Sequence, residues 1–119
     1  MKEFYFERLE VWQQSRVLAK EIYTISVSFP SEEKFGLISQ IRRATLSISA
    51  NIAEGMARIT EKDKARFINQ AFSSAIEVVN FLILANDLNL LTKEDYMNLR
   101  DRIEKITNQL NSLYKKFEK

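Results

Sequence analysis

Apolar residues recur along this chain at intervals of three and four, the spacing that places side chains on one face of an α-helix. Three breaks interrupt the pattern, at residues 29–31, 55–60 and 89–92. The pattern therefore predicts four helices, at about residues 9–28, 32–54, 61–88 and 93–117. Because the connections are short, consecutive helices should run antiparallel. We expect a single domain over residues 1–119, folded as an all-α, antiparallel, up-down-up-down four-helix bundle.

The residues at the predicted helix ends agree with this pattern. Thr60 and Thr92 each precede a run that contains acidic residues, so each hydroxyl should cap a helix whose positive dipole end faces those acids. Ser31 opens the second helix directly after Pro30. Gly55 would be the residue that ends this helix.

The third helix carries two adjacent apolar stripes, whereas a helix in a monomeric bundle buries one face. Small residues in the second stripe permit close approach of another helix. We therefore predict a homo-oligomer with this stripe at the subunit interface; the alternative is a central helix that contacts all three others. The first stripe comprises Ile68, Phe72, Ala75, Val79 and Leu82. The predicted interface comprises Phe67, Ala71, Ser74, Val78 and Phe81.

Two absences from the composition exclude most classes of enzyme. The 119 residues include no His and no Cys, which removes the Ser-His-Asp triad, cysteine nucleophiles, disulfides and the commonest metal ligands. We expect no catalytic residues, no metal and no cofactor. No apolar run approaches the ~20 residues of a membrane span, and the N-terminus lacks a signal-peptide core. We therefore expect a cytoplasmic protein with no membrane partner.

The net charge of +2, from 18 basic and 16 acidic residues, permits a nucleic-acid partner without requiring one. Cations gather between the second and third predicted helices and at the end of the fourth. They would contact phosphates of RNA or DNA, although solvated helix faces with no ligand are the alternative. The first group, which we call the junction cluster, comprises Arg58, Lys62, Lys64 and Arg66. The other candidate phosphate-binding cations are Arg42, Arg100, Lys115 and Lys116.

Polar residues also follow one face of the second predicted helix, with Glu77 and Ser74 on the third as candidate partners. This polar seam is open to two interpretations. It is either a binding or catalytic stripe, or a hydrogen-bonded contact between helices or subunits that fixes their register. Its acids are too few for a tight metal site. The seam comprises Gln40, Arg43, Ser47, Asn51, Glu54 and Glu77.

Four aromatic residues stand near the N-terminus and could stack on nucleic-acid bases. Such residues more often pack in a core or form an arm at an interface, so packing is the favoured interpretation. The four are Phe4, Tyr5, Phe6 and Trp12.

Three runs carry a resemblance to a known family: residues 40–44 (QIRRA), 51–55 (NIAEG) and 71–77 (AFSSAIE). Together they resemble the four-helix-bundle family named for the protein encoded by the intervening sequence of bacterial 23S rRNA genes. The accessory variability protein of diversity-generating retroelements is similar as a distant relative. The resemblance implies a homo-pentameric ring, a nucleic-acid-binding role and no established catalytic activity.

The residues and the resemblance together favour a non-enzymatic, oligomeric helical bundle that binds nucleic acid through a ring of Arg and Lys side chains. Backbone electrostatics would then dominate, with little readout of base sequence. The alternative is a protein-interaction scaffold, whose ring presents a surface to a partner protein such as a polymerase.

Overall fold

The computed structural model describes residues 1–118 and, within them, every side chain except those of Lys34 and Phe35. Four long helices dominate: α1 (Glu10–Ser26), α2 (Ser39–Met56), α3 (Glu61–Asp87) and α4 (Lys93–Phe117). Short helical turns precede α1 and α2, namely η1 (Tyr5–Arg8), η2 (Ser31–Glu33) and η3 (Lys34–Ile38). Since residues 1–118 contain no strand, the predicted all-α four-helix bundle is confirmed.

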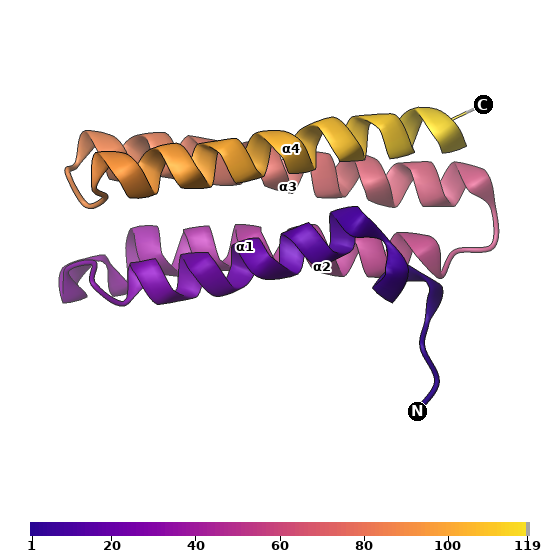
Figure 1. Ribbon diagram of the computed structural model, residues 1–119, viewed down its shortest axis with the longest axis horizontal. Helices are drawn as coiled ribbons and strands as arrows, with labels where there is room; N and C mark the ends of the chain where they lie inside the picture. Colours follow the sequence, from indigo (N-terminus) through magenta and orange to yellow (C-terminus); the bar gives the residue numbers. More distant parts are fainter. Residues whose placement is uncertain (119) are drawn as a thin grey trace.

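The four helices lie side by side along the long axis of the bundle, and the chain reverses direction at each connection (Figure 1). The most extensive contacts are those of α3 with α2 and α4, and the least extensive are those of α1 with α4. Both termini and the α2–α3 connection lie at one end of the bundle, which we call the junction end (Figure 1). The α1–α2 and α3–α4 connections lie at the other, which we call the loop end.

The core is built from the apolar faces that the spacing predicted. It contains residues from all four helices that are at most a few per cent exposed, among them Leu18, Ile48, Ile68 and Ile103. A smaller cluster around Phe29 and Ala85 closes the loop end. By length and composition α3 is long and apolar enough to cross a membrane. Within the bundle a third of its most apolar window is buried, by packing against α2 and α4.

The second helix departs from its predicted range of 32–54. An α-helix begins only at Ser39, because residues 31–38 form two short turns and Gly36 adopts a non-helical conformation (φ −103°, ψ −106°). The helix also continues past Gly55, which was expected to end it, as far as Met56. Gly55 is buried against α3, so its small size serves close packing of two helices.

The predicted caps of α3 and α4 are confirmed. The hydroxyl of Thr60 accepts a hydrogen bond from the Asp63 N–H at 3.1 Å, and that of Thr92 accepts one from the Asp95 N–H at 3.0 Å. Beyond the other end of α3, Asn89 has a positive φ of 59°. The Leu90 N–H then donates to the Ala85 carbonyl at 2.9 Å, which is a left-handed helix termination.

The predicted oligomer interface on α3 needs correction. Phe67, Ala71 and Val78 are buried inside the chain's own core, so they offer no surface to a second copy. Ser74 faces α2, where its hydroxyl is 2.9 Å from that of Ser47. Only Phe81 keeps partial apolar exposure. The buried arc of α3 is wide because the helix packs against α2 on one side and α4 on the other.

Candidate nucleic-acid interface

The junction cluster occupies the α2–α3 connection and the first turns of α3. The Thr60 cap starts α3 abruptly, so Lys62 and Arg66 project from its exposed first turns. Lys64 has a different role, because its ammonium donates to the carbonyls of Met56 and Arg58. Placed there, its charge satisfies carbonyl groups at the end of α2 and stabilises the negative end of the helix dipole.

Two arginines of the cluster share one aromatic ring. The guanidinium carbon of Arg58 lies 4.4 Å from the ring centre of Phe67, and that of Arg66 lies 4.7 Å from it. Asp63 is 3.6 Å from Arg66 in an exposed ion pair of the kind that contributes little to stability. Because a buried ring positions both guanidiniums, their N–H groups are held ready for an anion at little further entropic cost.

The end of α4 adds cations to the same region. A pocket of about 400 Å³ lies between the start of α3 and the end of α4, and it is lined by Lys62, Arg66, Tyr114 and Phe117, among others. Lys115 and Lys116 stand in the last turn of α4. The antiparallel packing of α3 on α4 therefore brings the two predicted groups of cations to one end of the bundle (Figure 1).

Arg42 and Arg100, two other predicted phosphate-binding residues, lie elsewhere and are engaged within the chain. Arg42 donates to the Ser26 hydroxyl at 2.8 Å and to the Tyr23 carbonyl at 3.3 Å, so it ties α2 to the end of α1. Arg100 donates to the Tyr96 hydroxyl at 2.7 Å, in the second turn of α4 at the loop end. Neither belongs to the group of cations at the junction end.

The polar seam joins α2 to α3. Arg43 donates to Gln40 at 3.2 Å and to a Glu77 carboxylate oxygen at 2.5 Å. One turn further along, the Ser47 hydroxyl meets that of Ser74, and it also accepts from the Asn51 amide at 3.0 Å. These bonds support the interpretation of the seam as a contact between helices.

Glu54 lies outside this network. Its side chain is exposed at the end of α2, whereas Glu77 is bound to Arg43 on the other helix. Across residues 1–118 no group of three or more carboxylates is placed to hold a metal ion. The two acids therefore form no pair of the kind that acid–base catalysis requires.

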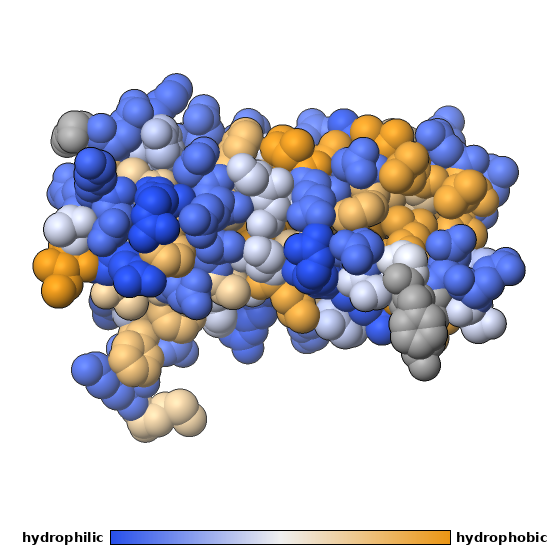
Figure 2. Space-filling model, turned by 180° about the vertical axis from the view of Figure 1, so that it is seen from behind, coloured by the Kyte–Doolittle hydropathy of each residue, from blue (hydrophilic) through white to orange (hydrophobic). Residues whose placement is uncertain are grey.

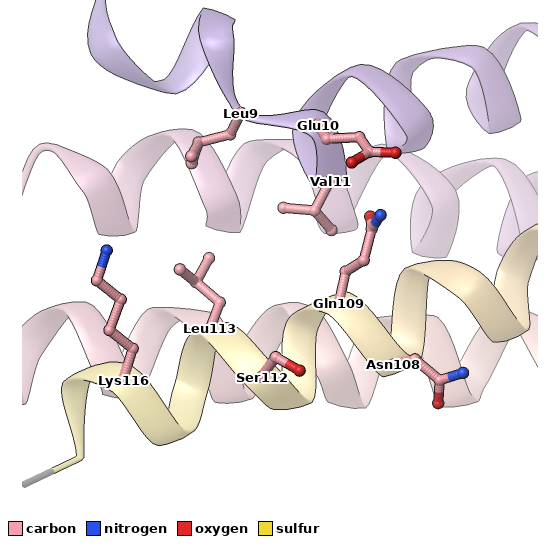
Figure 3. Close-up of a pocket in the computed structure, with 8 residues that line it drawn as sticks. All are labelled: Leu9, Glu10, Val11, Asn108, Gln109, Ser112, Leu113 and Lys116. Carbon is pink, nitrogen blue, oxygen red and sulfur yellow. The ribbon is translucent and has the colours of Figure 1, made fainter.

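A second pocket, of about 440 Å³, lies between the start of α1 and the last turns of α4 (Figure 3). Leu9 and Val11 point across it toward Leu113, and these three side chains make its lining largely apolar. Lys116 stands at one edge (Figure 3), so one cation of the junction end borders an apolar hollow. Periodicity alone gave no indication of this pocket, because it arises from the sparse contact between α1 and α4.

The face formed by α2 and α3 is polarised along its length. Figure 2 shows hydrophilic side chains gathered toward the junction end and hydrophobic ones over the C-terminal half of α3. The exposed apolar residues of that half, which we call the α3 apolar surface, are Ile76, Ile83, Leu84 and Leu88. One end of this face is therefore mainly hydrophilic and the other mainly hydrophobic.

The comparisons with known proteins agree with this architecture. The model of the 23S rRNA-intervening sequence protein family matches residues 7–112. A crystal structure of a protein with unknown function from the S23 ribosomal protein family of Bacteroides thetaiotaomicron superposes with a TM-score of 0.80 and 28% identity, covering 88% of this chain and 98% of that one. No match is found among curated proteins. Because the family model covers most of its length, this helical chain belongs to the 23S rRNA-intervening sequence protein family.

Proposed function

We propose that this protein is a non-enzymatic nucleic-acid-binding protein that contacts phosphates through the cations of the junction end. The observation that carries the proposal is the pair of guanidiniums, Arg58 and Arg66, held over the Phe67 ring. Each guanidinium is positioned by the same ring, so each can meet a phosphate with little further ordering of its side chain. Lys62, Lys115 and Lys116 extend the positive surface around them.

The uneven distribution of basic residues supports a directional attraction. Acids occur at both ends, but most of the candidate phosphate-binding cations lie at the junction end. A net charge of only +2 therefore conceals an uneven placement of these cations along the bundle. Because the field of such a molecule steers a polyanion toward one end, the weak overall charge is compatible with localised binding.

A salt-dependent titration tests this function. Labelled structured RNA and duplex DNA are titrated with the protein at about 50 and 200 mM salt, with fluorescence anisotropy as the readout. Five phosphate contacts on duplex DNA predict a loss of affinity of roughly 500-fold over that range. Absence of binding at the lower salt, or binding insensitive to salt, would contradict the proposal.

A second candidate function, a scaffold assembled from several copies, is supported by the α3 apolar surface. Ile76, Ile83, Leu84 and Leu88 are all large, apolar and exposed. Leu84 and Leu88 also border a pocket of about 300 Å³ beside Leu37 and Phe81. We propose that self-association covers this surface, in place of the buried stripe predicted from the sequence; a homo-pentameric ring remains what the family resemblance implies.

Self-association would also increase the binding of nucleic acid, because each added copy repeats the same cations on a single particle. Sedimentation of the wild-type protein and of an Ile83→Asp variant tests it. We expect an oligomer at micromolar concentration that the variant shifts toward monomer. A wild-type monomer, or an oligomer that the variant leaves unchanged, would contradict self-association through this surface.

A further inference from the structure

We propose that the N-terminal arm, residues 1–8, is a stacking surface for unpaired bases, so that the preferred ligand of the junction end is single-stranded nucleic acid. This inference rests on the proposed function, since the arm would supply ring contacts while the junction-end cations supply phosphate contacts. The arm and the α2–α3 connection lie at the same end of the bundle (Figure 1). One nucleic-acid strand could therefore reach both.

The second half of the arm, η1 (Tyr5–Arg8), is a helical turn tied to α1. The Glu7 N–H donates to the Phe4 carbonyl at 3.0 Å, while the Phe4 N–H donates to a Glu7 carboxylate oxygen at 2.8 Å. The Gln13 amide then donates to the Glu7 carbonyl at 2.5 Å, which links the turn to the first turns of α1. Because these bonds hold the backbone from Phe4 to Arg8, binding a ligand on the rings of Phe4 and Tyr5 requires little ordering of that segment.

The four aromatic residues divide into an inner and an outer pair. Phe6 and Trp12 are half-buried and pack edge to face, with ring centres 5.0 Å apart. Phe4 stacks on Phe6, with centres 6.4 Å apart and planes 17° from parallel. Phe4 and its neighbour Tyr5 are 56% and 49% exposed. Packing therefore explains the inner rings, whereas Tyr5 and the part of Phe4 that is not stacked on Phe6 are available to a ligand.

A cation accompanies each outer ring. The Lys2 ammonium lies 5.4 Å from the Phe4 ring centre, and the Arg8 guanidinium lies 5.8 Å from that of Tyr5. Glu3 is the acid near Arg8, at 3.9 Å between exposed side chains, so that pairing is weak. Each cation lies over its ring, so a base that stacks there takes the place of the cation, which stays close enough to meet the phosphate.

This arrangement selects unpaired strands. In a duplex the faces of the bases are covered by their neighbours, and only edges and backbone are exposed in the grooves. In a single strand every base offers a face to an aromatic side chain, whatever its sequence. The arm therefore adds to the affinity for single strands, whereas the junction-end cations contact the phosphates of both single strands and duplexes.

The experiment uses the intact protein and its single tryptophan, Trp12, whose contact with Phe6 makes it a reporter of the arm. Trp12 fluorescence and anisotropy are followed with three ligands of about 12 nucleotides: an oligo(dT) strand, an abasic strand of the same length, and a duplex. The variants are Phe4→Ala with Tyr5→Ala, and Phe4→Tyr as a conservative exchange. Ile59→Ala is the matched control, because Ile59 is 97% exposed at the same end but has no ring.

We expect oligo(dT) to bind roughly tenfold more tightly than the abasic strand, the effect of about one stacked base. The double alanine variant should abolish that difference, while Phe4→Tyr and Ile59→Ala should preserve it. Equal affinity for oligo(dT) and the abasic strand, or an equal loss in Ile59→Ala, would overturn the stacking surface while leaving phosphate binding intact. If none of the three ligands binds, the proposed function itself fails.

Discussion

A methyl group added to Gly55 would lie 2.8 Å from the Cβ atom of Phe67, closer than real Cβ atoms approach one another. The end of α2 therefore packs directly against the start of α3 at a position where only glycine fits. Phe67 is also the ring that positions Arg58 and Arg66. The glycine thus permits the packing on which the arrangement of the junction cluster depends.

Gly55→Ala should accordingly destabilise the protein. Alanine improves helix propensity by about 1 kcal/mol, but overpacking a buried contact between helices typically costs about 1–3 kcal/mol. We expect a net loss in the free energy of unfolding, measured by urea denaturation followed by circular dichroism. Glu54→Ala, an exposed exchange at the preceding residue, is the control and should change it by no more than about 0.5 kcal/mol. A stabilised Gly55→Ala variant would contradict the close contact.

The close contact between Gly55 and Phe67 could not be predicted from the sequence. The three- and four-residue spacing identified four helices and most of their buried faces, because each helix must hide one apolar side. The same reasoning took Gly55 for the end of a helix, since glycine is common there. A close approach between helices depends on the tertiary structure, and a local pattern contains no information about it.

The burial of the predicted interface stripe of α3 gives a second prediction. Val78 is fully buried and Ile83 is 40% exposed. Val78→Ala should therefore lower the free energy of unfolding by about 1–3 kcal/mol, from lost burial and a residual cavity. Ile83→Ala should change the stability of the folded chain much less.

Both variants are measured by urea denaturation at low protein concentration, so that self-association contributes little. If Val78→Ala were neutral for folding but weakened self-association, the interface predicted from the sequence would be correct after all. That prediction separated two stripes one residue apart. The structure instead has one broad buried arc, because both α2 and α4 pack against this helix.

The candidate site was predictable in part. Antiparallel order alone implies that the end of α4 lies beside the start of α3, so the placement of Lys115 and Arg66 at the same end of the bundle follows from the predicted topology. The internal roles of Arg42 and Lys64 do not follow from it. Their acceptors are main-chain carbonyls and a serine hydroxyl, groups that any exposed stretch of sequence also contains.

The polar seam leads to a third prediction, on the coupling between Arg43 and Glu77. Their side chains are 55% and 36% exposed, so water and salt screen the pair despite its short distance. A double-mutant cycle with Arg43→Gln and Glu77→Gln should give a coupling of about 0.5 kcal/mol or less at physiological salt. A coupling above about 2 kcal/mol that persists in high salt would show that the pair is desolvated, for instance by a second copy.

The fourth prediction concerns which cations bind nucleic acid. Arg58→Gln and Arg66→Gln should each weaken binding to all sequences by a similar factor and reduce the slope of log affinity against log salt by about 1. Arg102→Gln is the matched control, because it removes an equal charge from a side chain engaged with Gln14 and Glu21. Anisotropy titrations at several salt concentrations measure all three. If Arg102→Gln reduced the slope as much as the other two variants, binding would depend on the net charge of the protein and not on the two guanidiniums that contact the Phe67 ring.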